Sequence, residues 1–434
     1  MKIEALKNKK ILVLGMGREG RAVLEFLRKI FPKKILGVGD REKKIKSQIS
    51  KIKSVRWHLG SNYLKALEKY DVIIKSPGIP IHIPEIERAF RMGKITSQTE
   101  IFLENYPGKI IGITGTKGKS TTTALIYRIL KEAGLRVHLG GNIGKPAISF
   151  LKSAQKDDIF VYELSCHQLY NLKKSPDIAI LLNIYPEHLD YYRDSKEYVK
   201  AKSNITRWQG ESGILIYNSK DKTVREIAKR SKARKIKIGP ERCSHILKNV
   251  RIKFVPEVNL TAAIETARLF GVSREIIKKA VEKFKTLPYR LEFVGEFRGI
   301  RFYNDSSSTN PEATIFALNQ LNGKVETLIL GGQDRGVDLE KLAKRILKSN
   351  IKNLLLFPPS GERIWREFFS LKKSNRFRAF LVQNMKDAVE LAFRFTGRGK
   401  VCLLSPASPS FGIFKDYKER GNLFKKYVKR YVEK

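Results

Sequence analysis

A glycine-rich turn between an apolar run and a helix constrains this chain more than any other feature. Residues 110–114 read Ile-Ile-Gly-Ile-Thr, and Gly-Thr-Lys-Gly-Lys-Ser-Thr follows at 115–121. Beyond Ser120, apolar side chains recur at helical intervals until Gly134 ends the pattern. Backbone N–H groups of such a turn, the N-terminus of the following helix and one lysine all face the same anion. The sequence therefore predicts a phosphate-binding loop for ATP or GTP.

The loop is shorter than the strict phosphate-loop pattern. That pattern places a glycine five positions before Gly118, where this chain has Ile113. An ordinary glycine turn between a strand and a helix is the alternative interpretation. Because a strand, a turn, the pair Lys119 and Ser120, and a helix coincide here, we favour nucleotide binding.

Length and composition limit the remaining classes. With 434 residues and a hydrophobic content of 42%, the chain can form two or three domains with cores of their own. No apolar run is long enough to cross a bilayer, and residues 1–10 lack the apolar segment of a signal peptide. Cys166, Cys243 and Cys402 show neither metal-ligand spacing nor a disulfide framework. We expect a cytoplasmic protein without a membrane span.

The chain is strongly basic, since 86 Lys and Arg against 43 Asp and Glu give a net charge of +43. The basic residues are spread along the chain, and the densest runs, at 43–53, 372–378 and 425–430, suit solvated faces or loops. No zinc finger, helix-turn-helix or aromatic-basic RNA motif is present. We expect a general lysine-rich surface and no specific nucleic acid partner; contact with a polyanion or a membrane surface is the alternative.

The N-terminal region carries a second glycine-rich turn. Residues 10–14 form an apolar run that leads into Gly-Met-Gly-Arg-Glu-Gly at 15–20 and a periodic helix, and a second apolar run ends on Asp40. This is a Rossmann-like fingerprint, although Gly-x-Gly-x-x-Gly alone is a weak signal. It is compatible with a dinucleotide or with any ligand that carries a diphosphate. A further strand is expected at 71–75, followed by a turn at 76–78.

Two more α/β units follow. Continuous apolar runs predict buried parallel strands at 159–164, 178–183 and 213–217, with a helix at 259–270. Leu287 and Pro288 form a natural linker, and later strands are expected at 326–330, 352–357 and 400–404. The fold class is therefore α/β with mainly parallel sheets.

Polar side chains follow several of these strands. Glu163 ends one strand and is placed to hold Mg²⁺ beside the phosphate loop; a helix N-cap or a surface acid is the alternative. His188, in the short polar loop 183–190, is a candidate metal ligand, substrate-orienting group or base, although a lone histidine is more often structural. Lys202, one of 86 basic residues, reads by itself as a solvated helix charge.

The C-terminal third offers three candidate binding segments. Asp305 and Thr309 lie in the polar segment 303–311, which suits a substrate loop or a plain turn. Residues 405–411 form a similar loop of small side chains after a strand. Arg335 follows a Gly-Gly turn, where a cation could meet a carboxylate.

Taken in order, these segments resemble the Mur ligases, the ATP-dependent amide-forming enzymes of peptidoglycan precursor synthesis, over the whole chain. The loop at 115–121 resembles the family's Gly-Thr-Asn-Gly-Lys-Ser-Thr, with Lys117 in place of Asn. Residues 163–169, Glu-Leu-Ser-Cys-His-Gln-Leu, are similar to Glu-Leu-Ser-Ser-Phe-Gln-Leu of the glutamate-adding member, which its sister ligases lack. Residues 183–190 resemble Asn-Ile-x-x-Asp-His-Leu-Asp, and segments 287–290, 304–306, 330–332 and 404–408 also have counterparts.

The resemblance implies three domains: a Rossmann-like UDP-substrate domain at 1–99, a P-loop-type central ATPase domain at 100–287, and a Rossmann-like domain for the amino acid at 288–434. It implies that ATP contacts Gly115, Thr116, Lys117, Gly118, Lys119, Ser120, Thr121, Arg290 and Asp305. It implies that the UDP-sugar contacts Gly15, Gly17, Arg18, Glu19, Asp40, Arg41, Ser76, Gly78, Asn142 and His188. It implies that glutamate contacts Thr309, Arg335, Ser410 and Tyr417.

The resemblance also implies a reaction. ATP would phosphorylate the alanine carboxylate of UDP-N-acetylmuramoyl-L-alanine, and the amine of glutamate would then attack the acyl phosphate. Lys119, Glu163, His188 and Lys202 would be the catalytic residues, with two Mg²⁺ ions, one on Ser120 and Glu163 and one on His188 and Lys202. Lys202 would be carbamylated by carbon dioxide, which reverses its reading as a solvated charge. We expect a monomer, and the sequence leaves D- and L-glutamate open.

The chain departs from the family pattern at several positions. Val255 and Pro256 replace a His-Asn pair, Ser307 replaces a lysine, Arg335 stands where lysine is common, and Cys166-His167 replaces Ser-Phe. The alternatives are another Mur-type or folylpolyglutamate-type ligase and, in a different class, a non-catalytic nucleotide-binding or polyanion-binding protein. The Glu-Leu-Ser segment and the loop at 405–410 argue against the first alternative.

Overall fold

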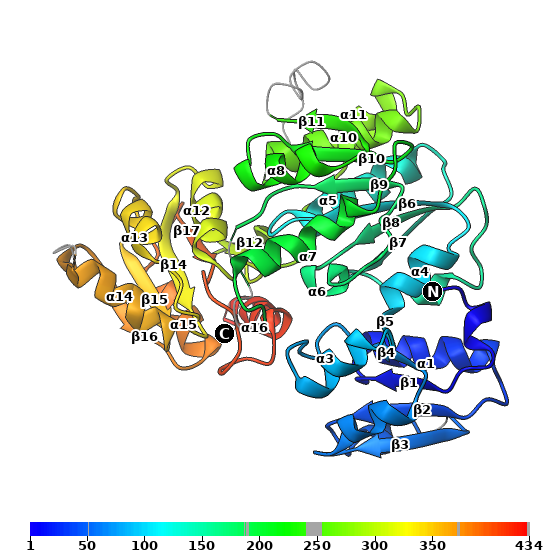
Figure 1. Ribbon diagram of the computed structural model, residues 1–434. Helices are drawn as coiled ribbons and strands as arrows, with labels where there is room; N and C mark the ends of the chain where they lie inside the picture. Colours follow the sequence, from blue (N-terminus) through cyan, green and yellow to red (C-terminus); the bar gives the residue numbers. More distant parts are fainter. Residues whose placement is uncertain (51, 186, 188–190, 240–253, 371–373, 432–434) are drawn as a thin grey trace. The chain divides into compact units, whose positions relative to one another are not determined.

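The computed structural model describes residues 1–50, 52–185, 187, 191–239, 254–370 and 374–431. These residues form three sheets, each flanked by helices (Figure 1). Two compact units emerge from the contacts: Met1–Arg251 with Pro256–Phe284, and Ile252–Val255 with Lys285–Lys434. The first unit contains the first two sheets and the second unit contains the third. None of the described helices combines the length and the apolar character that spanning a membrane requires. The predicted α/β class with mainly parallel sheets is confirmed.

The first sheet, with its helices, is called the first domain here. Its strands are β1 (Ile11–Leu14), β2 (Leu36–Asp40), β3 (Val55–Leu59), β4 (Val72–Lys75) and β5 (Ile95–Thr96). They are all parallel and run in the order β3-β2-β1-β4-β5. The helical segments are η1 (Glu4–Leu6), α1 (Arg18–Ile30), α2 (Ile45–Gln48), η2 (Tyr63–Lys69) and α3 (Pro84–Arg91).

The turn between β1 and α1 depends on Gly20. A Cβ atom at Gly20 would lie 1.9 Å from the carbonyl oxygen of Gly15, so only glycine allows α1 to begin this close to the strand end. The Rossmann-like fingerprint therefore forms the predicted strand-turn-helix unit.

The second sheet, with its helices, is called the second domain. Its strands are β6 (Lys109–Thr114), β7 (Val137–Gly141), β8 (Ile159–Glu163), β9 (Ile178–Leu181), β10 (Ile214–Asn218) and β11 (Arg234–Ile238). They are all parallel, in the order β11-β10-β9-β6-β8-β7. The helical segments are α4 (Gln98–Asn105), α5 (Lys119–Glu132), η3 (Ala147–Phe150), α6 (Cys166–Leu169), α7 (Ser195–Arg207), α8 (Lys222–Arg230), α10 (Glu257–Leu269) and α11 (Arg274–Glu282).

Helix α4 joins the two domains of the first unit. Ile101 is buried in the core of the first domain, whereas Phe102 and Leu103, the next two residues, are buried in the core of the second. Because neighbouring side chains of one short helix point to different sides, α4 packs into both cores at once. The two domains of this unit therefore share a packed boundary.

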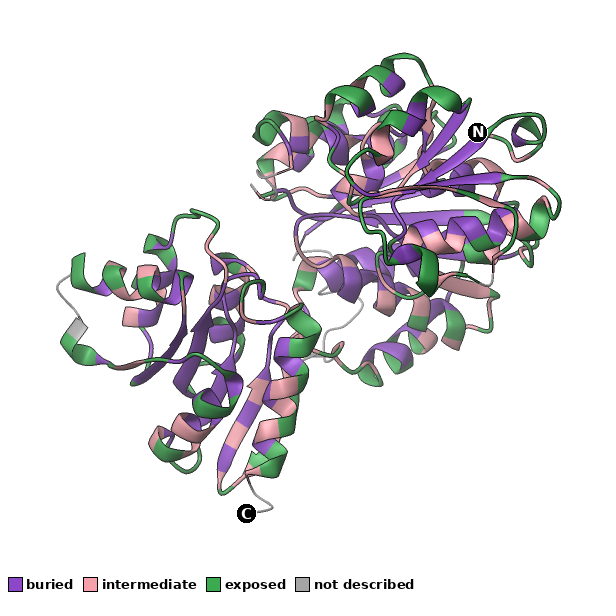
Figure 2. Cartoon of the chain, turned by 90° about the horizontal axis from the view of Figure 1, so that it is seen from below, coloured by how far each residue is buried: buried purple, intermediate pink, exposed green. Residues whose placement is uncertain are grey.

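The second unit is a six-stranded sheet. Its strands are β12 (Glu292–Phe297), β13 (Ile300–Asn304), β14 (Val325–Gly331), β15 (Asn353–Phe357), β16 (Arg378–Leu381) and β17 (Val401–Leu404), in the order β12-β13-β17-β14-β15-β16. Only β12 pairs antiparallel, with β13. The helical segments are α12 (Pro311–Gln320), α13 (Glu340–Leu347), α14 (Ser360–Ser370), η4 (Ser374–Arg376), α15 (Met385–Phe395) and α16 (Tyr417–Arg430). In Figure 2 the central strands are buried, while each helix is buried along one face.

Two strands end earlier than their apolar runs predict. The expected strand at 178–183 ends at Leu181, because Asn183 turns toward the phosphate loop: its Oδ1 accepts from Lys117 N at 2.8 Å and its Nδ2 donates to Lys117 O at 3.0 Å. The expected strand at 159–164 likewise ends at Glu163. In both cases the chain leaves the sheet where its side chains begin to contact the predicted nucleotide site.

Candidate functional site

The phosphate loop connects β6 to α5. Gly118, the residue before α5, has φ +87°, and a Cβ there would meet Oδ1 of Asn259 at 2.5 Å. Asn259, on α10, is 1% exposed and lies against the loop. A glycine is therefore required both by the backbone and by the side chain that packs on it. This arrangement matches the predicted loop and adds Asn259, which sequence analysis missed.

Two lysines converge on one carbonyl of this loop. Lys119 Nζ donates to Gly115 O at 2.8 Å and to Thr116 O at 2.9 Å, and Lys202 Nζ donates to the same Gly115 O at 2.9 Å. Burial lowers the pKa of Lys119. Burial and the charge of Lys119 lower the pKa of Lys202 to about 7. Two lysine amines held this close provide hydrogen-bond donors for a polyphosphate anion.

Reading Lys202 as a solvated helix charge is wrong. Its side chain is 1% exposed, and its ammonium lies 5.0 Å from the ring centre of Tyr198 on the same helix, α7. Tyr198 also contacts the loop, with its hydroxyl 2.9 Å from Thr116 Oγ1. Lys202 therefore belongs to the inner face of α7, which lies against the phosphate loop.

Two residues that follow β9, Tyr185 and Glu187, also contact the loop. Lys117 Nζ forms an ion pair with Glu187 at 3.0 Å, and Tyr185 N donates to Thr116 Oγ1 at 2.9 Å. The candidate His188 lies outside the described residues. Among the described residues before it, Asn183, Tyr185 and Glu187 contact the loop.

Glu163 lies at the carboxyl end of β8, next to β6, where Ile113 is its neighbour in the ladder. It is 1% exposed, and its Oε1 accepts from Asn142 Nδ2 at 2.8 Å. Its Oε2 is buried and has no hydrogen-bond partner among the described residues. Ser165, not Glu163, caps α6, so the alternative of a helix N-cap is wrong.

This geometry fits a magnesium site. Mg²⁺ takes oxygen ligands and keeps several waters, and a buried carboxylate oxygen without a donor is costly unless a cation or water meets it. Ser120, the first hydroxyl of α5, is also buried, at 5% exposure. The described residues contain no cluster of three or more His, Cys, Asp or Glu, so a metal here would rely on few protein ligands.

The glycine loop of the first domain reaches the same region. Arg18 donates to Gly141 O at 2.6 Å and to Asn142 O at 3.1 Å, while Asn142 holds Glu163. Glu19 accepts from Gln168 Nε2 at 2.6 Å. The predicted UDP-sugar residues thus connect directly to the predicted metal residue through Asn142.

The other predicted UDP-sugar residues gather where β1, β2 and β4 end. Asp40 accepts from Met16 N at 2.6 Å, and Ser76 Oγ donates to Gly15 O at 2.6 Å. Gly17, Arg41 and Gly78 are exposed at this edge. In open α/β sheets, ligands bind at this carboxyl edge.

The second unit gathers another predicted group at the ends of β13, β14 and β17. Asp305 is buried, and it accepts from Ser308 Oγ at 2.6 Å, Ser405 Oγ at 2.8 Å and Leu291 N at 3.1 Å. Burial raises the pKa of Asp305 to about 6. Ser410 is buried as well, whereas Thr309 and Arg290 are half-buried and Arg335 and Tyr417 are exposed.

Sequence analysis missed Arg420 on α16. It is fully buried, and it donates to Ser306 O at 2.8 Å and to Ser408 O at 3.1 Å. Its guanidinium thus links the loop that follows β13 to the loop that follows β17. Both loops contain predicted nucleotide or glutamate residues, so Arg420 supports the shape of this region.

The sequence matches three family descriptions in succession. "Mur ligase MurD-like, N-terminal domain" matches residues 9–96, "Mur ligase middle domain" matches 113–296, and "Mur ligase, glutamate ligase domain" matches 289–408. The structure contains the phosphate loop, the buried Lys202 and the buried Glu163 at the same site. Together with these matches, this shows that the chain belongs to the Mur ligase family. This family comprises ATP-dependent, ADP-forming ligases that use Mg²⁺.

Among its relatives are proteins named UDP-N-acetylmuramoylalanine--D-glutamate ligase. The one from Acetivibrio thermocellus is 34% identical, with 98% of this chain and 97% of the relative covered. The one from Clostridium tetani is 32% identical, with 97% of each covered. The solved structure of UDP-N-acetylmuramate-alanine ligase MurC from Thermotoga maritima has a TM-score of 0.60 at 17% identity, covering 98% of this chain and 100% of that one. MurF from Acinetobacter baumannii has a TM-score of 0.61 at 17% identity, covering 96% and 90%. These structures support the fold.

Proposed function

We propose that this chain is the ligase that joins D-glutamate to UDP-N-acetylmuramoyl-L-alanine and converts ATP to ADP and phosphate. The relatives that carry this name span nearly the whole chain. The observation that carries the proposal is Asn142, which contacts both Arg18 of the first domain and Glu163 beside the phosphate loop. A carboxylate acceptor bound along the first domain would therefore end close to the γ-phosphate of ATP.

The chemistry would proceed in two steps. An oxygen of the alanine carboxylate attacks the γ-phosphorus, the bond to the β-phosphate oxygen breaks, and ADP leaves. The amine of D-glutamate then attacks the acyl carbon, loses a proton, and inorganic phosphate departs. Lys119 would stabilise the charge on the transferring phosphoryl group. Mg²⁺ held by Ser120 and Glu163 would neutralise further charge there.

We propose that Lys202 carries a carbamate that, with His188, holds a second Mg²⁺. A pKa of about 7 leaves much of this amine neutral and nucleophilic at physiological pH. Its nitrogen attacks carbon dioxide, a C–N bond forms, and one proton is released.

Lys202→Ala should lose activity by at least about 100-fold, as loss of one charge-stabilising group in an active site does. Added acetate or propionate should restore part of it; full activity without added acid would contradict the carbamate.

The remaining assignments belong to the same proposal. Residues 1–99 would hold the UDP-sugar, 100–287 ATP, and 288–434 the amino acid, with Thr309, Arg335, Ser410 and Tyr417 around the glutamate carboxylates. Arg290 and Asp305 would contact the nucleotide. The protein would act as a monomer in the cytoplasm, in synthesis of the cell-wall precursor. The sequence departures at Ser307 and Arg335 lie in this C-terminal region, so amino-acid specificity is the property to test first.

The test is ADP formation with purified UDP-N-acetylmuramoyl-L-alanine and four amino acids: D-glutamate, L-glutamate, D-aspartate and L-lysine. We expect turnover with D-glutamate alone. Lys119→Ala should abolish phosphate release and leave the circular dichroism spectrum unchanged, because this lysine contacts the loop rather than a core. A wild-type chain that consumes no ATP with any of the four would overturn the proposed function, and turnover with another amino acid would correct its substrate.

A further inference from the structure

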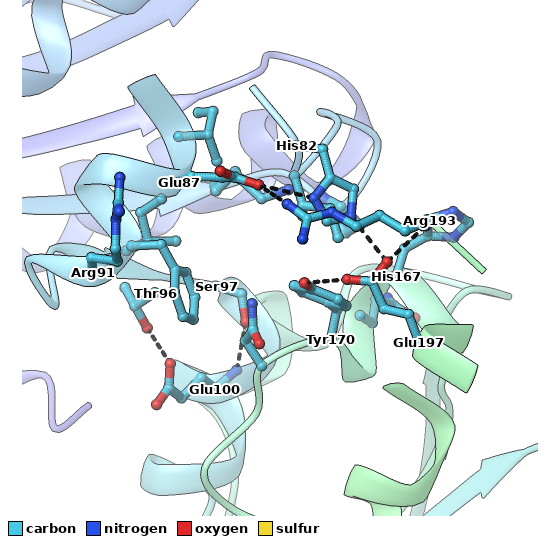
Figure 3. A pocket seen from close by; sticks show the side chains of 18 residues that line it. His82, Glu87, Arg91, Thr96, Ser97, Glu100, His167, Tyr170, Arg193 and Glu197 are labelled. Carbon is cyan, nitrogen blue, oxygen red and sulfur yellow. Dashed lines mark hydrogen bonds and ion pairs between the residues drawn. The ribbon is translucent and has the colours of Figure 1, made fainter. Parts of the chain in front are cut away.

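The two domains of the first unit meet at a cavity of about 340 Å³ (Figure 3). The first domain contributes the segment after β4, α3 and β5, and the second contributes the start of α4, the end of α6 and the start of α7. The carboxylates that line it, Glu87, Glu100 and Glu197, all accept hydrogen bonds from neighbouring side chains. Because these carboxylates are already paired, the cavity is better suited to holding the two domains together than to binding a ligand. We call the cluster of His82, Glu87 and Glu197 the joint.

His82 is the centre of this joint. Its Nδ1 lies 3.0 Å from Oε1 of Glu87 on α3, and its Nε2 lies 3.0 Å from Oε2 of Glu197 on the first turn of α7. An ionised carboxylate only accepts hydrogen bonds, so both ring nitrogens must donate. This requirement is met by the imidazolium, which is then a cation between two anions, one from each domain.

Other bonds at the joint converge on the same two carboxylates. Tyr170 Oη donates to Glu197 at 2.9 Å, and Arg193 donates from its backbone N–H to Glu197 at 2.8 Å and from its guanidinium to Glu87 at 2.6 Å. The hydrogen bond from His82 holds the pKa of Glu87 below its usual value. Burial opposes ionisation of Glu197, but the bonds from Arg193, His82 and Tyr170 outweigh it, so its pKa is also lowered. Both carboxylates are therefore ionised at neutral pH.

The start of α7 matters because of what this helix carries. Asp194 caps it by accepting from Glu197 N at 2.7 Å, and Lys202 lies on the inner face of the same helix, bonded to Gly115 O. Tyr191, just before the helix, donates to Pro77 O at 3.0 Å in the first domain. A displacement of the first turn of α7 would thus be transmitted along a rigid helix to Lys202.

We propose that His82 is a positioning residue for the ligase reaction: it joins Glu87 to Glu197, fixes α7 against the first domain, and thereby sets Lys202 relative to the phosphate loop. The inference rests on the proposed function for its kinetic consequences, but not for its structural ones. The hydrogen bonds of His82 go to Glu87 and Glu197, neither of which is a predicted substrate residue, so His82 acts through Glu197.

The other titratable or charged groups around the cavity are Lys75 from β4, Arg91 from α3, Glu100 from α4, and His167 and Tyr170 from the second domain. Burial and the bond to Glu197 raise the pKa of Tyr170 to about 12, so its phenol stays a donor at neutral pH.

The activity-independent test is amide hydrogen exchange on the full chain at neutral pH. In His82→Gln, the amides of residues 196–199 should exchange about tenfold faster than in the wild type, because local opening of this turn loses one charged bridge. Amides of β6 and α5 should exchange at unchanged rates. His58→Gln is the matched control, since His58 bonds within its own domain to Tyr70 Oη at 2.8 Å. Equal exchange at residues 196–199 in the wild type and His82→Gln overturns the proposal.

The kinetic test separates positioning from general destabilisation. In His82→Gln, kcat should fall about tenfold while KM for ATP stays within about twofold, since β6 and α5 are untouched. An unchanged kcat, or equal losses in kcat and ATP affinity, overturns the proposal. A wild-type chain without ligase activity would instead overturn the proposed function, and the exchange measurement would still decide the role of His82.

Discussion

At the scale of single residues, Glu19 shows a conflict between stability and contact across domains. Its Oε1 accepts from Gln168 in the second domain, but its Oε2 is buried without a hydrogen-bond partner among the described residues. Burial raises the pKa of Glu19 to about 6, against the bond from Gln168 and the charge of Arg18. An acid whose folded-state pKa exceeds its unfolded value costs stability at every pH above the window between the two.

The substitution Glu19→Gln should therefore stabilise the protein at neutral pH. The cost of ionising Glu19 is absent below its unfolded pKa of 4.5 and fully present above a pH of about 6. The rise in the pKa of Glu19 from 4.5 to about 6 corresponds to about 2 kcal/mol of unfolding free energy. Urea unfolding should show the variant more stable than the wild type by up to about 2 kcal/mol near pH 7.5, and equal to it near pH 4.5.

Glu25→Gln on the same helix is the control for this prediction. Glu25 is exposed, so its substitution should shift stability at neither pH. A Glu19→Gln variant that is less stable than the wild type near pH 7.5, with no dependence on pH, would mean that the charge of Glu19 is needed for folding. The predicted outcome would instead mark Glu19 as a residue retained for its contact with Gln168 rather than for stability.

At the scale of elements, the sequence predicted most of the interior strands, whereas the edge strands β3, β5, β7, β11, β12 and β16 were not predicted. Apolar runs such as residues 11–14 and 178–181 are buried on both sides in parallel sheets, and that pattern is local. Where strands end was predicted less well, since Asn183 leaves β9 through bonds to Lys117 that lie 66 residues away in the sequence. Such bonds depend on the assembled sheet and have no local signal.

Two buried charges had a signal that could have been used. Lys202 follows Tyr198 and precedes Ile205 on α7, and both neighbours are buried, so the lysine lies on the apolar stripe of the helix. Arg420 likewise shares the inner face of α16 with Phe424 and Val428. A charged side chain within an apolar stripe at helical spacing predicts a buried functional or structural ion. Reading Lys202 as solvated came from counting basic residues rather than from its helix position.

The joint at His82 could not be predicted from sequence by any such rule. Its carboxylates lie on two helices of different domains, and His82 itself lies in a connecting segment without periodicity. The three side chains come together only where the two domains of the first unit meet. The candidate site is therefore predictable where motifs are continuous in sequence, and not where domains meet.

At the scale of the whole molecule, the net charge of +43 is the property that the ligase chemistry leaves unexplained. Basic residues outnumber carboxylates, so a carboxylate can pair with more than one of them. Glu132, for example, forms ion pairs with both Lys279 and Lys283. The remaining cations repel each other across the surface. Self-repulsion of this kind destabilises the compact state and is screened by salt.

Raising the salt concentration should consequently stabilise this protein. Between about 20 mM and about 300 mM NaCl, the Debye length falls from about 20 Å to about 6 Å, so most long-range repulsion between surface lysines is removed. The unfolding entropy of 434 residues is about 0.9 kcal/mol/K, so if screening contributes about 1–2 kcal/mol the melting temperature should rise by roughly 1–2 °C. Differential scanning calorimetry at fixed pH measures this shift directly.

A variant in which the exposed residues Lys29, Lys65, Lys341 and Lys426 are replaced by glutamate should melt higher at low salt and gain less from added NaCl. A melting temperature that is unchanged or falls with salt would show that the basic residues are already balanced locally, because attractive pairs weaken under screening whereas repulsive ones relax.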